Sequence, residues 1–197
     1  MARPDFGERI ARALQSIVER ETEAFASLRP ERILIVSGAA RRDARASIRP
    51  LRFQDGTLRS PDGRFEKPTI QVGGVNMLYE ICLRPRFFLD TSAEGRLKTL
   101  VHELWHVGAA AAGALDPLRR HRAMAEDQGS SPQGFEAQVE LLSARLVEAG
   151  VHRQLSGGFE AMLRAWMIRP PSQFPITSKV RRTYDERDLF QGIVEIR

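Results

Sequence analysis

Apolar residues at the start of the chain recur at helical spacing and then give way to strand-like runs. Residues 4–28 carry an apolar side chain near every third or fourth position, with Arg and Glu between them, which predicts an amphipathic helix. Residues 32–37 form a continuous apolar run and residues 46–53 alternate between apolar and polar, so both predict strands. Pro50 restricts the second of these strands to a sheet edge or a bulge. Further strands are predicted over residues 69–72 and 75–83.

The second half of the chain has a mainly helical pattern. Helices are predicted over residues 90–107, 132–149 and 158–168. Residues 109–129 lack a regular pattern and predict a long irregular connection, while the tail predicts a hairpin or two separate strands over residues 176–184 and 189–196. The order of helix, strands and helices predicts an α+β fold with a small mixed sheet. The length of 197 residues suits a single domain over residues 1–197.

Composition narrows the class of protein. A hydrophobic fraction of 42% is too high for a disordered chain, and no apolar run approaches the about 18 residues that a membrane span needs. The charged first residues are unlike a secretory signal peptide. Cys82 is the single cysteine of the chain, so it cannot form an internal disulfide and is expected to be a small buried apolar residue. We therefore expect a cytoplasmic protein without a membrane partner.

The chain carries a moderate excess of positive charge, because 30 Lys and Arg outnumber 25 Asp and Glu to give a net charge of +5. Such a balance attracts polyanions weakly and in a salt-dependent way. The basic residues are spread along the chain, so nucleic acid is a secondary expectation as a partner. One group of basic residues could bind phosphate or an acidic partner: Arg41, Arg42, Arg45, Arg49 and Arg52. The simpler interpretation is that these arginines alternate on the solvent-exposed face of a sheet.

The candidate catalytic and metal-binding residues are found at positions 102–106, which read His-Glu-Leu-Trp-His and form an HExxH motif. His102 and His106 are four residues apart, so on a helix both imidazoles lie on one side and can bind the same zinc ion. Glu103 lies beside that pair, near enough to take a proton from a water molecule that zinc activates. This is the role of the general base in a zinc hydrolase.

The residues around the motif divide the predicted helix into an apolar and a polar side. The apolar side consists of Leu97, Leu100, Val101, Leu104, Trp105 and Gly108, and the polar side of Thr99, His102, Glu103 and His106. Thr91 and Glu94 form a capping box that predicts the helix start. The apolar side can pack in the core while the polar side lines a cleft. The alternative is a polar side that is simply exposed to solvent.

In layout, residues 31–150 resemble the zincin metallopeptidases, in which an edge strand precedes the HExxH helix; residues 75–83 would be that strand. The resemblance is greatest to small bacterial zincins, with the SprT-like and ImmA/IrrE-like proteins as the nearest named relatives. It implies that His102 and His106 bind zinc, that Glu103 activates water, and that the edge strand binds an extended peptide by backbone pairing. The metzincin branch is excluded, because Ala109 and Ala112 stand where metzincins have a glycine and a histidine.

The third zinc ligand has no fixed place in the sequence. His121, on an Arg-rich segment that could fold back, is the first choice. Glu136 and Glu140, one turn apart on the next predicted helix, match the gluzincin use of a carboxylate from a following helix. Further alternatives are Glu126, Asp127 and His152.

These features predict a zinc-dependent metallopeptidase that hydrolyses a peptide or protein substrate with Glu103 as general base. Tyr184 is a weaker candidate for stabilising the oxyanion, with a surface tyrosine as the simpler interpretation. The alternative function is a catalytically inactive zincin-like module that binds a protein or nucleic-acid partner. A zinc hydrolase that acts on a non-peptide substrate is a third hypothesis, since activated water attacks many acyl groups.

Overall fold

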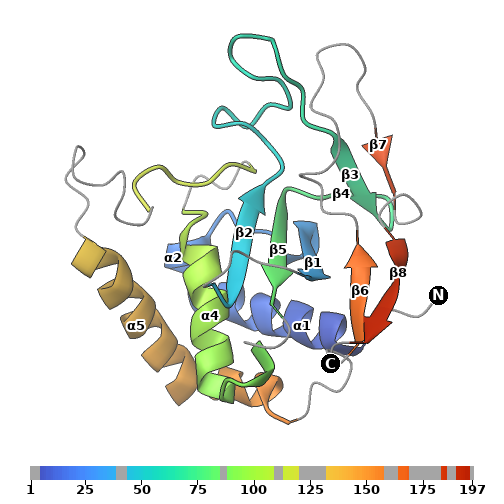
Figure 1. Ribbon diagram of the computed structural model, residues 1–197. Coiled ribbons are helices and arrows are strands. Elements are labelled where there is room, and N and C mark those ends of the chain that lie inside the picture. Colours follow the sequence, from blue (N-terminus) through green and yellow to red (C-terminus); the bar gives the residue numbers. More distant parts are fainter. Residues whose placement is uncertain are drawn as a thin grey trace.

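Helices and strands combine in a mixed α+β architecture (Figure 1). The computed structural model describes residues 5–38, 44–84, 88–108, 113–119, 132–157, 164–168, 183–185 and 190–195. Within these ranges the strands form two small mixed sheets and a separate antiparallel pair, which confirms the α+β class expected from the sequence. The helices of the described ranges include none with the length and apolar character that crossing a membrane requires.

The N-terminal helical region is two helices rather than the single helix predicted over residues 4–28. Helix α1 spans Asp5–Arg20 and α2 spans Thr22–Phe25. Glu21 separates them because its backbone leaves helical conformation, with φ −112° and ψ 52°. The buried Glu21 carboxylate forms an ion pair with Arg145, which ties this break to a helix from the second half of the chain. A short 3-10 helix, η1 (Pro30–Arg32), leads into the first strand.

The first sheet has the strand order β1-β5-β2. Strand β5 (Tyr79–Leu83) lies in the centre, parallel to β1 (Ile33–Ser37) and antiparallel to β2 (Ala46–Pro50). Every residue of β5 is buried, as expected for a central strand. Pro50 therefore lies on an edge strand, in agreement with the sequence prediction.

The prediction of one edge strand over residues 75–83 is wrong. The chain changes sheets inside this segment: β4 (Val75–Asn76) pairs with β3 (Thr69–Val72), and the central β5 begins three residues after β4 ends. Met77 and Leu78 make the crossing, with Met77 N–H donating to the carbonyl of Ile70 and Leu78 N–H to that of Arg32. The edges of this sheet are β1 and β2, and of the two β2 packs against the motif helix α4.

The C-terminal region differs most from its prediction. Residues 164–168, predicted as part of a helix, form strand β6 (Arg164–Ile168), which pairs antiparallel with β8 (Phe190–Glu195). Strand β7 (Thr183–Tyr184) pairs in parallel with β3. The two tail segments thus contain strands as predicted, but these strands pair with β3 and β6 rather than with each other.

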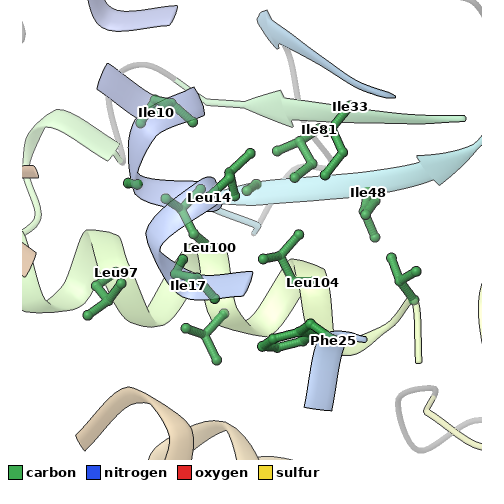
Figure 2. Close-up of a cluster of buried hydrophobic side chains, with 14 of the residues drawn as sticks. Ile10, Leu14, Ile17, Phe25, Ile33, Ile48, Ile81, Leu97, Leu100 and Leu104 are labelled. Atoms are coloured by element: carbon green, nitrogen blue, oxygen red, sulfur yellow. The ribbon is translucent and has the colours of Figure 1, made fainter. Parts of the chain in front are cut away.

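The main core lies between the first sheet and the helices. Helix α4 (Ala93–Trp105) packs beside α5 (Pro132–Glu148), and the 3-10 helix η3 (Val151–Leu155) packs against both (Figure 1). Figure 2 shows side chains from α1, α4 and the sheet meeting in one cluster, whose labelled members include Leu14, Ile81 and Leu100. These three side chains are fully buried. This packing fixes α4 under the sheet and so determines which side of α4 remains for chemistry.

A second, smaller cluster lies on the opposite face of the sheet. Successive residues of a strand point to opposite faces, so Leu34, Val36 and Cys82 pack away from the helices, with Ile70 and Met77. Tyr184 packs against this cluster, and Arg49 lies beside the buried Glu80 there, 3.7 Å away. Cys82 is a buried free thiol, as expected, and burial raises its pKa to about 11.

Candidate active site

The helix that carries the motif, α4, is anchored in the core by its apolar side. Leu97, Leu100, Val101 and Leu104 are fully buried, as the helical pattern predicts. The N-cap is Ser92, whose hydroxyl accepts a hydrogen bond from Gly95 N–H at 3.1 Å, rather than the predicted Thr91. The last helical residue is Trp105, and His106 caps the helix in right-handed helical conformation. The four-residue spacing of the motif histidines therefore remains on helical backbone.

The polar side of α4 is covered and does not form an exposed face. Glu103 is 6% exposed and His106 is 9% exposed, while the side chain of His102 is 23% exposed. Solvent therefore reaches the polar side of α4 mainly at His102. The alternative of a simple solvated polar surface is excluded by these values. Buried polar side chains need partners, and the surrounding elements provide them.

The two motif histidines lie at the separation that a shared zinc ion requires. Their ring centroids are 5.2 Å apart and the ring planes are inclined at 82°. A tetrahedral zinc ion about 2.1 Å from one nitrogen of each ring would hold the centroids about 5 Å apart. The Phe135 ring of α5 packs against both imidazoles, 5.0 Å from His102 and 4.9 Å from His106. This contact restricts the rotation of both rings.

His106 is oriented by a backbone carbonyl of the segment that follows the helix. Its Nδ1–H donates a hydrogen bond to the carbonyl oxygen of Arg119, with 2.6 Å between the atoms. A carbonyl oxygen can only accept, so Nδ1 carries the hydrogen and Nε2 carries the lone pair. Metal-binding histidines commonly have their second ring nitrogen held by such a carbonyl. The observed contact thus fits His106 as a zinc ligand through Nε2.

The loop that brings Arg119 to this place is itself tied to the sheet and to the helix end. Tyr79 of β5 donates its hydroxyl hydrogen to the carbonyl of Ala114 at 3.1 Å, and the same hydroxyl accepts from Gly113 N–H at 2.9 Å. Further along, Asp116 N–H donates to the carbonyl of His106 at 2.9 Å. Burial raises the pKa of Tyr79 to about 12, so its hydroxyl keeps the hydrogen that it donates at any physiological pH.

Glu103 is a buried carboxyl group in contact with the edge strand β2. Burial raises the pKa of its carboxyl group from 4.5 to about 7, and a hydrogen bond from the backbone N–H of Ile48 partly opposes this shift. Ile48 belongs to the edge strand β2, so Glu103 joins the motif helix to the edge of the sheet. A base works best when its pKa lies near the working pH, because it is then both available and sufficiently basic.

Of the candidates for a third zinc ligand, the structure brings Glu136 beside the histidines. Its Oε1 lies 3.7 Å from His102 Nδ1, and its side chain is 55% exposed. Glu140 points to Lys98 instead and forms an ion pair with it. His152 lies on η3, which packs at the start of α4, where Arg96 donates to the carbonyl of Leu155. Three other candidates, His121, Glu126 and Asp127, lie outside the described residues.

The described side chains fit part of a zinc site rather than a whole one. Among the residues that the structure describes, there is no group of three or more His, Cys, Asp or Glu side chains arranged to hold a metal ion. Catalytic zinc sites use three protein ligands and leave one position for water or substrate. His102 and His106 lie at the ring separation of two zinc ligands, and His106 is in the tautomer that leaves Nε2 with its lone pair. For a complete zinc site, a third ligand would have to come from residues outside the described ranges, or a described side chain would have to move closer when zinc binds.

The remaining predicted residues lie away from this site. Tyr184 packs on the opposite face of the sheet, which separates it from Glu103 and argues against a role in oxyanion binding. Arg49 and Glu80 lie on that face too, and Arg49 is only partly exposed there. Neither Phe135 nor Arg119 was predicted to lie at the histidines. Phe135 had the apolar spacing of a core residue, and Arg119 contributes a backbone carbonyl, which any residue type possesses.

Comparisons with protein-family models, characterised proteins and solved structures yield no match to this chain.

Proposed function

We propose that this chain is a zinc-dependent hydrolase of the peptidase class, with Glu103 as its general base. The observation that carries the proposal is the pair of histidines with ring centroids 5.2 Å apart, beside the buried Glu103 carboxyl group. In the metal-free protein burial raises the pKa of that carboxyl group to about 7, which agrees with a role in accepting and releasing a proton.

His102 and His106 would hold the zinc ion. The hydrogen bond from His106 Nδ1 to the Arg119 carbonyl supports Nε2 as the ligating atom. His121 and Glu136 are the proposed sources of the third ligand, and Glu136 has the support of its position 3.7 Å from His102. A carboxylate or an imidazole in that role is equally compatible with zinc.

Bound zinc would supply a Lewis acid that polarises the scissile carbonyl and lowers the pKa of a water molecule. Glu103 would accept a proton from the attacking water molecule and then transfer it to the leaving amine. Burial of Glu103 limits competition from bulk solvent for this proton. Phe135 and the Arg119 carbonyl restrict the rotation of the imidazole rings throughout the reaction.

The position of β2 supports a peptide as the substrate. This strand is at the edge of the sheet, so one row of its backbone N–H and C=O groups lies outside the sheet ladder. Its Ile48 amide contacts Glu103, which brings the edge within hydrogen-bond distance of the proposed base. An extended peptide that pairs with an edge strand presents its carbonyl groups along that edge.

The test combines metal analysis with a single substitution at the base. The purified protein is loaded with zinc, and hydrolysis of an unstructured protein such as casein is measured before and after chelation. Glu103→Gln is expected to retain wild-type zinc content and to lose hydrolysis, whereas Glu94→Gln, exposed on the first turn of the same helix, retains both. Hydrolysis by the Glu103→Gln protein at the wild-type rate would refute the mechanism.

A second candidate is a zincin-like module that binds a protein or nucleic-acid partner without catalysis. The observation in its favour is that the described residues contain no group of three His, Cys, Asp or Glu side chains arranged to hold a metal ion. This function predicts a folded protein that binds no zinc even in excess. For a nucleic-acid partner it also predicts an affinity that falls steeply with salt concentration.

A further inference from the structure

Arg119 contacts the end of the motif helix through both its side chain and its backbone. Its guanidinium carbon lies 3.6 Å from the centroid of the Trp105 ring, and its carbonyl oxygen accepts the hydrogen bond from His106 Nδ1. Consecutive residues of a helix point about 100° apart around the axis. Arg119 therefore contacts two sides of the helix end, through its guanidinium group at Trp105 and through its carbonyl oxygen at His106.

The turn that contains Arg119 is also attached to His106. Asp116 N–H donates to the His106 carbonyl at 2.9 Å, and Arg119 N–H donates to the Asp116 carbonyl at 3.1 Å. The Asp116 carboxylate accepts from Leu118 N–H at 2.9 Å and lies 3.5 Å from Arg119 Nε. Gly108, with φ +69°, allows Asp116 to approach, since a Cβ there would lie 2.4 Å from Asp116 Oδ2. The His106 backbone holds the start of this turn, and the His106 ring holds its end.

Stacking is the main contact of the far end of the Arg119 side chain. Its Nη1 atom is buried and has no hydrogen-bond partner among the residues that the structure describes, and the guanidinium group contacts the indole face and the Asp116 carboxylate at Nε. A planar guanidinium stacks face to face on an aromatic ring, whereas the compact ammonium of lysine interacts with the ring only as a point charge. The contact therefore requires an aromatic residue at position 105 and arginine at position 119.

We propose that Arg119 is a positioning residue of the metal centre: by stacking on Trp105 it holds its carbonyl at His106 Nδ1 and thereby presents Nε2 as the ligating atom. This inference rests on the proposed function, because it takes His106 as a zinc ligand. Trp105, at one of the two variable positions of HExxH, then acts through Arg119 on its neighbour His106.

The test uses two measurements on metal-free protein with paired variants. Zinc affinity is measured by competition with a chromophoric chelator, and the tautomer of His106 is measured by nitrogen-15 NMR, with His106→Ala for assignment among the four histidines. Arg119→Met is expected to weaken zinc binding about 10–100-fold, as changes to groups that hold a metal ligand do, and to lose the Nδ1–H tautomer of His106. Arg119→Lys should behave in the same way.

Substitutions at Trp105 separate stacking from simple loss of structure. Trp105→Phe keeps an aromatic face and is expected to retain both the tautomer and zinc affinity within about threefold. Trp105→Leu is expected to match Arg119→Met. Arg153→Met, at an exposed arginine on η3, is the matched control and should leave both readouts unchanged. Circular dichroism of each metal-free variant identifies those that fold.

The outcomes separate this inference from the proposed function. If wild-type protein binds zinc and His106→Ala abolishes binding, but Arg119→Met keeps wild-type affinity or the wild-type tautomer, the positioning role is overturned and the hydrolase proposal stands. If Trp105→Phe loses as much zinc affinity as Trp105→Leu, stacking is not the cause and the inference is overturned. If wild-type protein binds no zinc, both proposals are overturned.

Discussion

Replacing Glu103 with glutamine is expected to stabilise the metal-free protein near neutral pH while it abolishes hydrolysis. Glu103 is 6% exposed, and burial raises the pKa of its carboxyl group from 4.5 to about 7. Ionisation therefore occurs more readily in the unfolded chain than in the folded protein. Glutamine has nearly the same shape and keeps an oxygen that can accept from the Ile48 N–H, but it carries no charge.

The size of the effect follows from the two pKa values. A raised pKa means that the folded protein holds its proton more tightly, so the contribution of Glu103 to stability is complete below pH 4.5 and is lost as the pH rises to about 7. This shift corresponds to about 3 kcal/mol in the free energy of unfolding, of which most is lost between pH 5 and pH 8. For a chain of this length that change corresponds to a shift of about 5–10 °C in the melting temperature.

The assay is urea unfolding in the presence of a chelator at several pH values from 5 to 8. The free energy of unfolding of the wild-type protein, relative to Glu103→Gln, is expected to fall by about 2–3 kcal/mol across this range. Glu94→Gln should parallel the wild type, because Glu94 is exposed and lies in the first turn of α4. If the wild type and Glu103→Gln show the same pH dependence, Glu103 does not ionise in a buried environment and the assignment as a tuned base fails.

Three further outcomes follow from the same contacts. Tyr79→Phe leaves a loop amide and a loop carbonyl without their partner and should lower the free energy of unfolding by about 1–3 kcal/mol, measured by urea titration. Gly108→Ala should be destabilising, by about 1–3 kcal/mol in thermal unfolding, because φ is +69° and the new Cβ would meet Asp116. Zinc content measured on His121→Ala and Glu136→Gln is expected to fall sharply in the one variant that lacks the third ligand, and equal retention in both would exclude both residues as ligands.

The local sequence pattern was sufficient to predict those elements whose apolar residues follow a single clear pattern. The continuous apolar run at Ile33–Ser37 and the helical spacing of Pro132–Glu148 occur within about a residue of their predicted bounds. Arg164–Ile168 could not be assigned in this way, because a short apolar run fits a helix and a strand equally well. Its strand partner Phe190–Glu195 lies more than twenty residues further along the chain, and that pairing decides its conformation.

The motif predicted which residues share one side of α4, but not what covers them. Periodicity places His102, Glu103 and His106 on a single side, and the structure agrees. It gives no information on the depth of burial, which depends on the approach of β2 and α5 from distant parts of the chain. The raised pKa of Glu103 is a consequence of that burial and could not be predicted from the five residues of the motif.

The environment of Glu103 also bears on the choice between an enzyme and a binding module. An ionised carboxyl group in this place costs the folded protein about 3 kcal/mol near neutral pH, a substantial part of the stability of an ordinary domain. A module that only binds a partner would be more stable with glutamine at this position, since the amide keeps the hydrogen bond from Ile48 without the charge. A hydrolase, by contrast, needs a group that gains and loses a proton near pH 7. The proposed hydrolase would therefore give the ionised Glu103 a use that offsets this cost, and the unfolding experiment above measures the cost itself.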